Sequence, residues 1–470
     1  MAISVRTWPA RLLARPWLLA FVPVNAATAG FGVLLPLLIL IPFGGDWANV
    51  ATAATVFNVA VIASSVVWGH LADRFPSRRP FLLVTYGGYA ALYLGLTQIH
   101  SLPVLYAVYA VIGLIAPAGA SASNLLILEQ FSAEERATAF ASFQEMTMVG
   151  SVAGLLIGFF WTSAGAALLG MDYVLAALAA ASALALWFGI RESPRALSTR
   201  SVARHPESLV SRLRVSASFR ISIPFFPRRP RLGPGAFARF RLWAAEELHH
   251  DLPLLLAGIF LFNLSANLYN ISYTPFLYSI GLGAASIFLV NFSNNFTQTL
   301  LFPLSGTLSN RIGPDRLVRV STFARAIGYL ATAGFTFAAL FGGPAFLANA
   351  LVYALLGGAI ALYTTSSSLI LFRGLEGRDA GGLLGINSAL GGVAAVLGAA
   401  LSGVLSVFGS FRLVFLVAAG ALLASLPIWT AASVAFRRRE DRRAALRAVR
   451  APGPPDPAGP PDAGPAAKPH

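Results

Sequence analysis

Two apolar segments are joined by the stretch Gly69-His70-Leu71-Ala72-Asp73-Arg74-Phe75-Pro76-Ser77-Arg78-Arg79. A degenerate copy joins two later apolar segments and reads Gly306-Thr307-Leu308-Ser309-Asn310-Arg311-Ile312-Gly313-Pro314-Asp315-Arg316. Its Gly, Leu and Arg follow those of the first copy by 237 positions, and the pair Gly377-Arg378 follows Glu135-Arg136 by 242 positions. The sequence therefore predicts two related halves that carry the same order of elements.

Long runs of the chain carry no Asp, Glu, Lys or Arg. These runs are 16–45, 47–72, 80–128, 146–171, 173–190, 252–310, 326–372, 380–411 and 413–436. A helix that crosses a bilayer core of ~30 Å needs ~20 apolar residues, so the three longest runs each hold two spans. Turn residues divide them at 100–103, 281–283 and 342–344. The pattern predicts an all-α polytopic membrane protein with twelve transmembrane helices in two six-helix repeats.

The composition agrees with a membrane chain and excludes an ordinary soluble enzyme. Of 470 residues, 56% are hydrophobic and 11% charged, whereas about a quarter are charged in soluble domains. The 34 Lys and Arg exceed the 19 Asp and Glu, for a net charge of +15, and they gather in alternate loops. By the positive-inside rule, both termini are predicted to be cytoplasmic, in a multi-pass protein of the cytoplasmic membrane. The charge-free runs argue against a nucleic-acid partner.

The chain divides into four predicted segments. Residues 1–190 form an N-terminal six-helix bundle, 191–251 a cytoplasmic connector, and 252–436 a C-terminal six-helix bundle. Residues 437–470 form a basic stretch followed by a Pro-rich tail, with eight Pro among the last twenty residues. Because such a composition cannot bury enough apolar area to fold, the tail is expected to be disordered.

The Gly-x-Leu-Ala-Asp-Arg-x-x-x-Arg-Arg loop, its degenerate copy and the twelve spans with a long central loop resemble the major facilitator superfamily. The sequence departs from the family pattern at Pro76, where Gly is usual, and at Asn310, where an acid is usual. The resemblance implies that Asp73 and the arginines after it latch the cytoplasmic ends of the two halves. The alternative is that these arginines only set the orientation. The candidate gating residues are Gly69, Asp73, Arg74, Arg78, Arg79, Gly306 and Arg311.

Two ionisable residues, Glu145 and Arg325, lie inside the predicted spans. Glu145 stands ~13 Å into its span, on the side away from a stripe of small residues, Gly150, Gly154 and Gly158, that suits close helix packing. Glu145 is a candidate for proton coupling, since an intramembrane acid is costly; the alternative is a structural acid bound to a polar neighbour. Arg325 is expected to extend toward the cytoplasmic headgroups.

Neutral amides are densest in the run 252–310, where they recur at helical spacing on two successive spans. Because amides that faced lipid would lack hydrogen-bond partners, both faces should turn inward. There they either bind each other across helices or line a path for a hydrogen-bonding solute. With sparser amides from the first half, the substrate-pathway candidates are Asn25, Asn58, Asn124, Asn263, Asn267, Asn270, Asn291, Asn294, Asn295 and Gln298.

Together these features predict a secondary active transporter that moves a small organic, neutral or amphipathic solute by alternating access. Export, as in drug or metabolite efflux, is the expected direction, with protons as the candidate coupling ion. The resemblance implies a pathway between the halves, lined by the first, second, fourth and fifth helices of each half. The alternatives are an importer of a sugar-like solute and a non-transporting membrane sensor or scaffold.

No enzymatic activity, cofactor or metal is expected. The sequence has no phosphate-binding G-x-x-x-x-G-K-[ST] loop. His249-His250-Asp251 resembles a metal site only loosely, because adjacent His side chains diverge by ~100° on a helix. Besides the substrate, membrane lipids are the expected partners of a monomeric chain.

Overall fold

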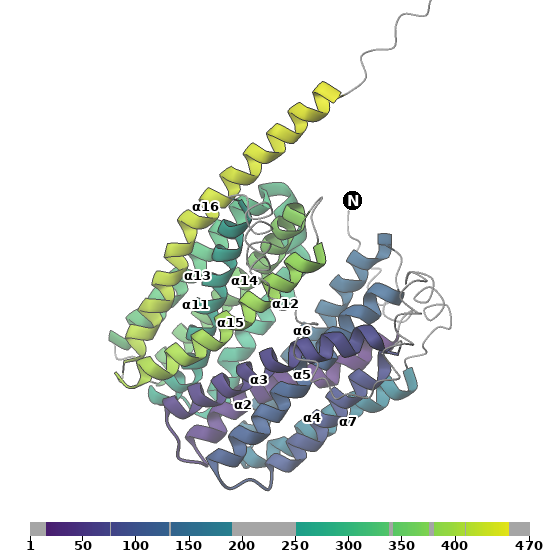
Figure 1. Ribbon diagram of the computed structural model, residues 1–470. Helices are drawn as coiled ribbons and strands as arrows, with labels where there is room; N and C mark the ends of the chain where they lie inside the picture. Colours follow the sequence, from purple (N-terminus) through teal and green to yellow (C-terminus); the bar gives the residue numbers. More distant parts are fainter. Residues whose placement is uncertain are drawn as a thin grey trace, which may run out of the picture.

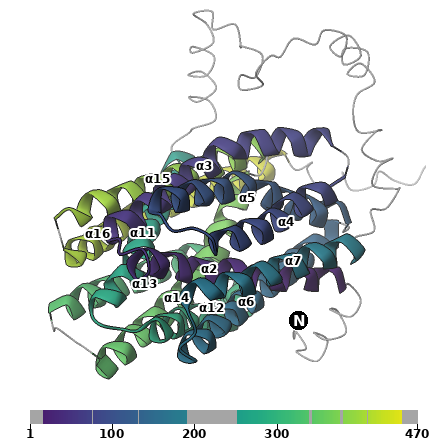
Figure 2. The ribbon, with the colours of Figure 1, turned by 90° about the horizontal axis from the view of Figure 1, so that it is seen from below.

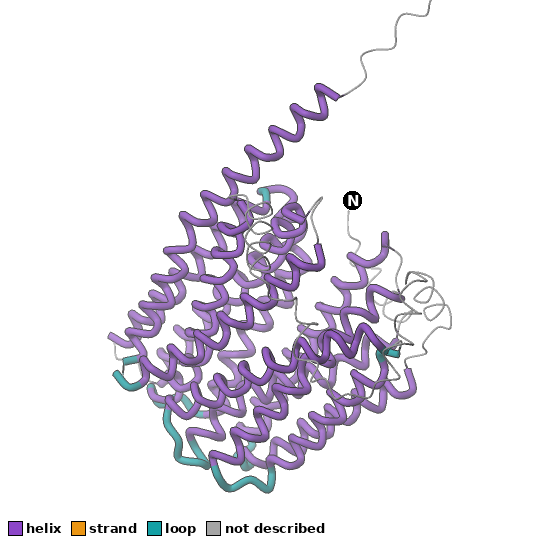
Figure 3. Tube along the Cα trace, viewed as in Figure 1, coloured by secondary structure: helices purple, strands orange, loops and turns teal. Residues whose placement is uncertain are grey.

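A computed structural model describes residues 16–75, 77–130, 133–189, 251–337, 342–375, 380–408 and 410–450. Within these ranges the regular structure is helical, without strands (Figures 1 and 3). The first group of helices is α2 (Phe21–Leu40), α3 (Trp47–Arg74), α4 (Arg79–Leu96), α5 (Leu102–Gln130), α6 (Ala133–Ser163) and α7 (Met171–Gly189). The second group is α11 (Asp251–Ser279), α12 (Ala284–Ile312), α13 (Pro314–Phe337), α14 (Gly342–Leu375), α15 (Ala380–Ser406) and α16 (Phe411–Arg450). Two short 3-10 helices, η2 (Pro16–Ala20) and η3 (Leu168–Gly170), precede α2 and α7.

These twelve α-helices confirm the predicted fold class. Nine of the described helices contain a stretch long and apolar enough to cross a membrane. The other three are the short α4, the amide-rich α12 and the Arg-containing α13. The predicted breaks are also correct: Gly281 and Gly342 adopt positive φ angles of 80° and 67° at the turns before α12 and α14, a conformation that favours glycine.

Helix ends differ clearly from the charge-free runs in three places. α6 begins at Ala133, well before the predicted start at Met146, and α13 begins at Pro314, well before Ala326. α16 continues beyond Phe436 to Arg450. The apolar runs mark the part of a helix that lipid requires, whereas Ala, Arg, Leu and Glu extend a helix into water. The tail residues 451–470 and the connector residues before Asp251 lie outside the described ranges.

The two groups of helices pack in the same pattern. In the first group, α2 contacts α6 and α7, α3 contacts α5, and α4 contacts α5 and α7. In the second, α11 contacts α15 and α16, α12 contacts α14, and α13 contacts α14 and α16. Each helix of the first group thus has an equivalent helix in the second group, the sixth α-helix after it along the chain. This confirms the two six-helix repeats predicted from the sequence offsets.

Two lateral contacts join the halves: α6 packs on α12, and α3 packs on α15. Figure 2 shows α2 and α11 in the middle, between these two contacts. The start of α2 and the end of α16 lie on the same side of the helices (Figure 1). We call this the terminal side and the opposite one the distal side. The turns before α3, α5, α7, α12, α14 and α16 lie on the distal side.

Glycines permit the closest of these helix contacts. A Cβ atom on Gly150 would lie 2.5 Å from the carbonyl oxygen of Val22, and one on Gly154 would overlap the backbone of Ala26. In the other half, a Cβ on Gly398 would lie 3.0 Å from the carbonyl oxygen of Leu264. The predicted small-residue stripe of α6 therefore packs on α2 through two of its three glycines.

Candidate functional site

On the distal side, the halves meet through an aromatic residue at the start of α3. Trp47 donates its Nε1–H to Ser402 Oγ of α15 at 3.0 Å and stacks on Phe411, with ring centroids 4.3 Å apart. Ser402 also shares a 2.8 Å hydrogen bond with Ser272 of α11. Trp47 is only 8% exposed, so the two halves enclose this network of contacts.

Phe288 makes the corresponding contact from the second half. It lies near the distal end of α12, is fully buried, and its ring rests against Gly158 of α6 where a Cβ would overlap it. The third glycine of the predicted stripe therefore serves the contact between halves, not the packing on α2. Each half thus inserts one aromatic ring against the fifth helix of the other. We call Trp47, Ser402, Phe411, Gly158 and Phe288 the distal seal.

Contacts between α3 and α15 can be followed from the distal side toward the terminal side at glycine positions of α15. Along α3 and α15 they run from Ala51 beside Gly403 to Ile62 beside Gly392, where the distances from the added Cβ atoms are 3.3 and 2.9 Å. Further along α3, nothing lies within 4 Å of the Cβ position of Gly69. The described glycine positions therefore record contact between α3 and α15 from Ala51, at the distal side, to Ile62.

The predicted gating residues lie around this terminal side. Gly306 also has no atom near its Cβ position, and Arg311 is exposed. Arg78 donates to the carbonyl of Phe75, and the guanidinium of Arg79 lies 4.3 Å from the ring centroid of Trp187 in α7 of its own half. The side chains of Asp73 and Arg74 lie outside the described part, so the latch stays a prediction.

The predicted amides fall into two sets, and the first is structural. Asn294 and Gln298 are buried. Asn294 Nδ2 donates to the Tyr353 carbonyl of α14 at 2.9 Å, and Gln298 Nε2 donates to Asn294 Oδ1 at 2.6 Å. Asn294 and Gln298 are therefore hydrogen-bonded to each other, and Asn294 also to α14. This matches the alternative in which the amides bind across helices and do not line a path for a solute.

The second set is half-buried. In each member, Nδ2 donates to the carbonyl four residues earlier in the same helix, at 2.7 to 3.2 Å, and no described hydrogen bond uses Oδ1. The members are Asn25, Asn58, Asn263, Asn267, Asn291 and Asn295. Asn270 is exposed, and the side chain of Asn124 lies outside the described part. The six amides of this set therefore have acceptor oxygens that no described hydrogen bond uses.

Two of these amides occupy equivalent positions in the halves. Asn267 follows Asn25 by 242 positions, the offset of the second pair of sequence matches. The Cβ of Asn25 lies 2.9 Å from the Cβ position of Gly150 in α6, and that of Asn267 lies 2.8 Å from the Cβ position of Gly398 in α15. The central helices α2 and α11 (Figure 2) therefore carry the amides of Asn25 and Asn267 at equivalent positions of the two halves.

Of the two ionisable residues within the predicted spans, Arg325 differs from expectation. Glu145 is half-buried in α6 and has no described hydrogen bond. Arg325 does not extend toward the headgroups: it is 2% exposed, and its Nε donates to Tyr329 Oη at 2.6 Å. Its guanidinium also lies 4.8 Å from the ring centroid of Phe262 in α11. The prediction for Arg325 was wrong because Tyr329, one turn deeper, supplies an acceptor and two ring faces replace water.

We expect Arg325→Ala to lower stability by about 2–4 kcal/mol, because it leaves a cavity and removes the ring contacts. Arg316→Ala on the same helix is the matched control, since Arg316 is exposed and such substitutions usually stay within about 0.5 kcal/mol. Thermal unfolding of both purified variants measures the difference. Equal unfolding temperatures would show that the buried contacts of Arg325 contribute nothing.

Sequence reasoning missed Asp172, which is fully buried in the first turn of α7. It falls between the predicted spans 146–171 and 173–190, where a charge is expected to face water. Apolar residues directly precede and follow Asp172, and this pattern could have indicated that its side chain is buried.

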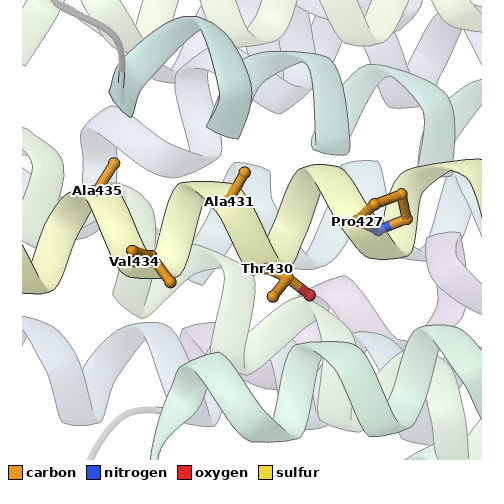
Figure 4. Close-up of a pocket in the computed structure, with 5 residues that line it drawn as sticks. All are labelled: Pro427, Thr430, Ala431, Val434 and Ala435. Atoms are coloured by element: carbon orange, nitrogen blue, oxygen red, sulfur yellow. The ribbon is translucent and has the colours of Figure 1, made fainter.

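The pocket in Figure 4 lies away from the contact between the halves. Its five lining residues, Pro427, Thr430, Ala431, Val434 and Ala435, all belong to one face of α16. Thr430 donates to the carbonyl of Leu426 in its own helix, and Val434 is 44% exposed. Since α16 is the last helix of its half and contacts α11 and α13, this face suits a lipid chain better than a polar solute.

Comparison with known proteins agrees with the helix arrangement. A sequence model of the family described as Major Facilitator Superfamily matches residues 17–290 and 255–462. No curated protein matches the sequence. Similar solved structures include a nucleoside transporter, with a TM-score of 0.61, 13% identity and coverage of 88% of this chain and 98% of that chain.

Two further solved structures have the same arrangement. The xylose transporter from E. coli has a TM-score of 0.63 and 14% identity, over 88% of this chain and 95% of that chain. A mutant of the peptide transporter POT has a TM-score of 0.64 and 12% identity, over 90% of this chain and 94% of that chain. At these identities the similarity concerns the fold.

Proposed function

The chain belongs to the major facilitator superfamily, and from this premise we propose that it is a secondary active transporter of a small neutral or amphipathic organic solute. The observation that carries the proposal is the pair Asn25 and Asn267, one acceptor amide at the equivalent position of each half. Small-solute sites of parallel-repeat transporters lie between the repeats, near the bilayer midplane. A solute bound between the halves could donate hydrogen bonds to Asn25 and Asn267 at the same time.

The chemistry of the described pathway favours an uncharged solute. The free Oδ1 atoms accept hydrogen bonds, so they suit hydroxyl or N–H donors of the solute. Seven of the eight pathway helices contain a candidate span, and Glu145 is the single charged residue among the described residues of these spans. In the eighth helix, α12, the charged residue is Arg311 in the last turn. An ionic solute would need an opposite charge to offset the desolvation of its own charge, whereas amides and ring faces bind a neutral one.

The state of the distal seal supports alternating access. With the distal side closed, a solute would reach Asn25 and Asn267 from the terminal side, which the positive-inside rule predicts to be cytoplasmic. Opening the distal side would require Trp47 to leave Ser402 and Phe288 to leave Gly158. We propose that these two aromatic contacts break and re-form in every transport cycle, with α2 and α11 holding the solute.

Export from the cytoplasm is the direction that we propose, by a monomer without enzymatic activity or cofactor. Import of a sugar-like solute is the second candidate, favoured by the suitability of amide oxygens for hydroxyl groups. Glu145 is the proposed site of proton coupling on this pathway. Uptake into right-side-out and inside-out membrane vesicles distinguishes the two directions.

A thermal-shift screen tests the solute class on the purified protein. The panel contains pentoses, hexoses, nucleosides, dipeptides and amphipathic dyes, because a ligand that binds only the folded state raises the unfolding temperature. We expect a neutral, hydroxyl- or amide-bearing solute to stabilise the wild type but not the double variant Asn25→Ala/Asn267→Ala. Stabilisation only by multiply charged solutes, or equal stabilisation of the double variant, would contradict the proposed site.

A further inference from the structure

Asp172 is a carboxyl group that the proposed pathway does not use. It is fully buried in the first turn of α7, and neither carboxyl oxygen has a hydrogen-bond partner among the described residues. Its position at a helix N-terminus would favour an anion, yet no backbone N–H of that turn donates to it. The side chain is therefore removed from water without the contacts that stabilise a carboxylate.

The residues around Asp172 supply no positive charge. On α4, Tyr93 is within electrostatic range of Asp172, and Tyr89 lies next to Tyr93. The facing helices α2, η2 and η3 carry no titratable residue in their described lengths. On α4, Arg79 contacts Trp187, fifteen residues further along α7 and so ~22 Å away along the axis.

From this geometry we propose that Asp172 is a proton-binding site, a carboxylic acid that holds its proton while the distal seal is closed. Burial without a partner disfavours the charged form of a carboxyl group. A metal cation would need several oxygen ligands, and the described residues contain no cluster of three His, Cys, Asp or Glu. One carboxyl oxygen therefore takes up the proton as the site becomes enclosed, and releases it to water when the site opens.

A short chain of contacts links Asp172 to the distal seal. Phe288 rests on Gly158 of α6, and Trp161, one turn later, donates its Nε1–H to the carbonyl of Ala167 at 3.0 Å. The ring of Trp161 also lies 3.0 Å from the Cβ position of Gly170, two residues before Asp172. Hydration of an ionised Asp172 would displace the turn under Trp161 and loosen α6 where it meets α12.

Infrared spectroscopy of the purified protein tests the proton site without any transport assay. In wild type labelled with ¹³C-aspartate, we expect the carbonyl stretch of a protonated acid at neutral pH, and its loss in Asp172→Asn. Asp46→Asn is the control, because Asp46 is exposed and accepts from the backbone N–H of Asn49. Should Asp172→Asn fail to fold, a pH titration of the labelled wild-type band answers the same question. Absence of a protonated aspartate at neutral pH would overturn the proposal.

The link to the seal rests on the proposed function, because it requires the halves to separate. Spin labels on Gln98→Cys and Val407→Cys, both exposed distal positions in opposite halves, report the distance across the distal side. We expect a longer distance population that grows with pH in the wild type and is independent of pH in Asp172→Asn. A protonated Asp172 with a pH-independent distance would overturn the link alone; Na⁺-dependent but pH-independent opening would identify a cation site instead.

Discussion

A disulfide between Ala51→Cys and Gly403→Cys is expected to reduce transport to the level of protein-free liposomes. The Cβ position of Gly403 lies 3.3 Å from the Cβ of Ala51, close to the ~3.5–4.5 Å that a disulfide requires. The bond would join α3 to α15 beside Trp47 and hold the distal side closed. Because the chain has no native Cys, no other disulfide can form, and a reductant should restore transport.

The pair Thr85→Cys/Gly119→Cys is the matched control for this experiment. The Cβ position of Gly119 lies 3.1 Å from the Cβ of Thr85, so this bond forms at a similar distance. It joins α4 to α5 within one half and should leave transport unchanged. Solute flux into liposomes is measured for both proteins, oxidised and reduced. Full transport by the oxidised Ala51→Cys/Gly403→Cys protein would show that the distal side need not open.

The double substitution Asn25→Ala/Asn267→Ala is expected to lower kcat/KM for the solute about 5- to 150-fold. Under the proposed function each amide accepts one hydrogen bond from the solute, worth about 0.5–1.5 kcal/mol. Every 1.4 kcal/mol changes the constant about tenfold. Each single substitution should show part of the loss. The kinetic constants of the reconstituted variants, compared with wild type, measure the effect.

Asn294→Ala separates binding from folding in this series. Asn294 is as polar as Asn267, but it is buried and donates to the Tyr353 carbonyl of α14. Its loss should lower thermal stability, because it leaves the carbonyl and Gln298 without their partner, and should leave KM unchanged. If Asn294→Ala raised KM as much as Asn25→Ala/Asn267→Ala, the assignment of the acceptor amides would be wrong.

The fold could be predicted from the sequence because lipid imposes a simple rule. Charge-free runs located all twelve helices, and glycine-containing turns divided the long runs correctly, as at Gly281 and Gly342. The helix ends that extend into water were not predicted, because Ala, Arg and Glu continue α6 and α16 beyond their apolar parts. The repeat offset of 242 positions also anticipated the equivalence of Asn25 and Asn267.

The site was predicted only in part, because contacts between distant segments leave no local pattern. Helical spacing grouped Asn294 with Asn291, yet Asn294 turns to Tyr353 of α14 while Asn291 stays half-buried. Arg325 was expected to extend toward the headgroups, whereas its contacts with Tyr329 and Phe262 hold it inside. Such outcomes depend on which partner the tertiary packing supplies.

The central claim is that the halves separate at the distal side around a solute held between Asn25 and Asn267. The distance between spin labels on Gln98→Cys and Val407→Cys, in lipid nanodiscs, tests it most directly. We predict two distance populations, a shorter one for the closed distal seal and a longer one, in a ratio that a transported solute changes. A single population that neither solute nor pH alters would contradict the account.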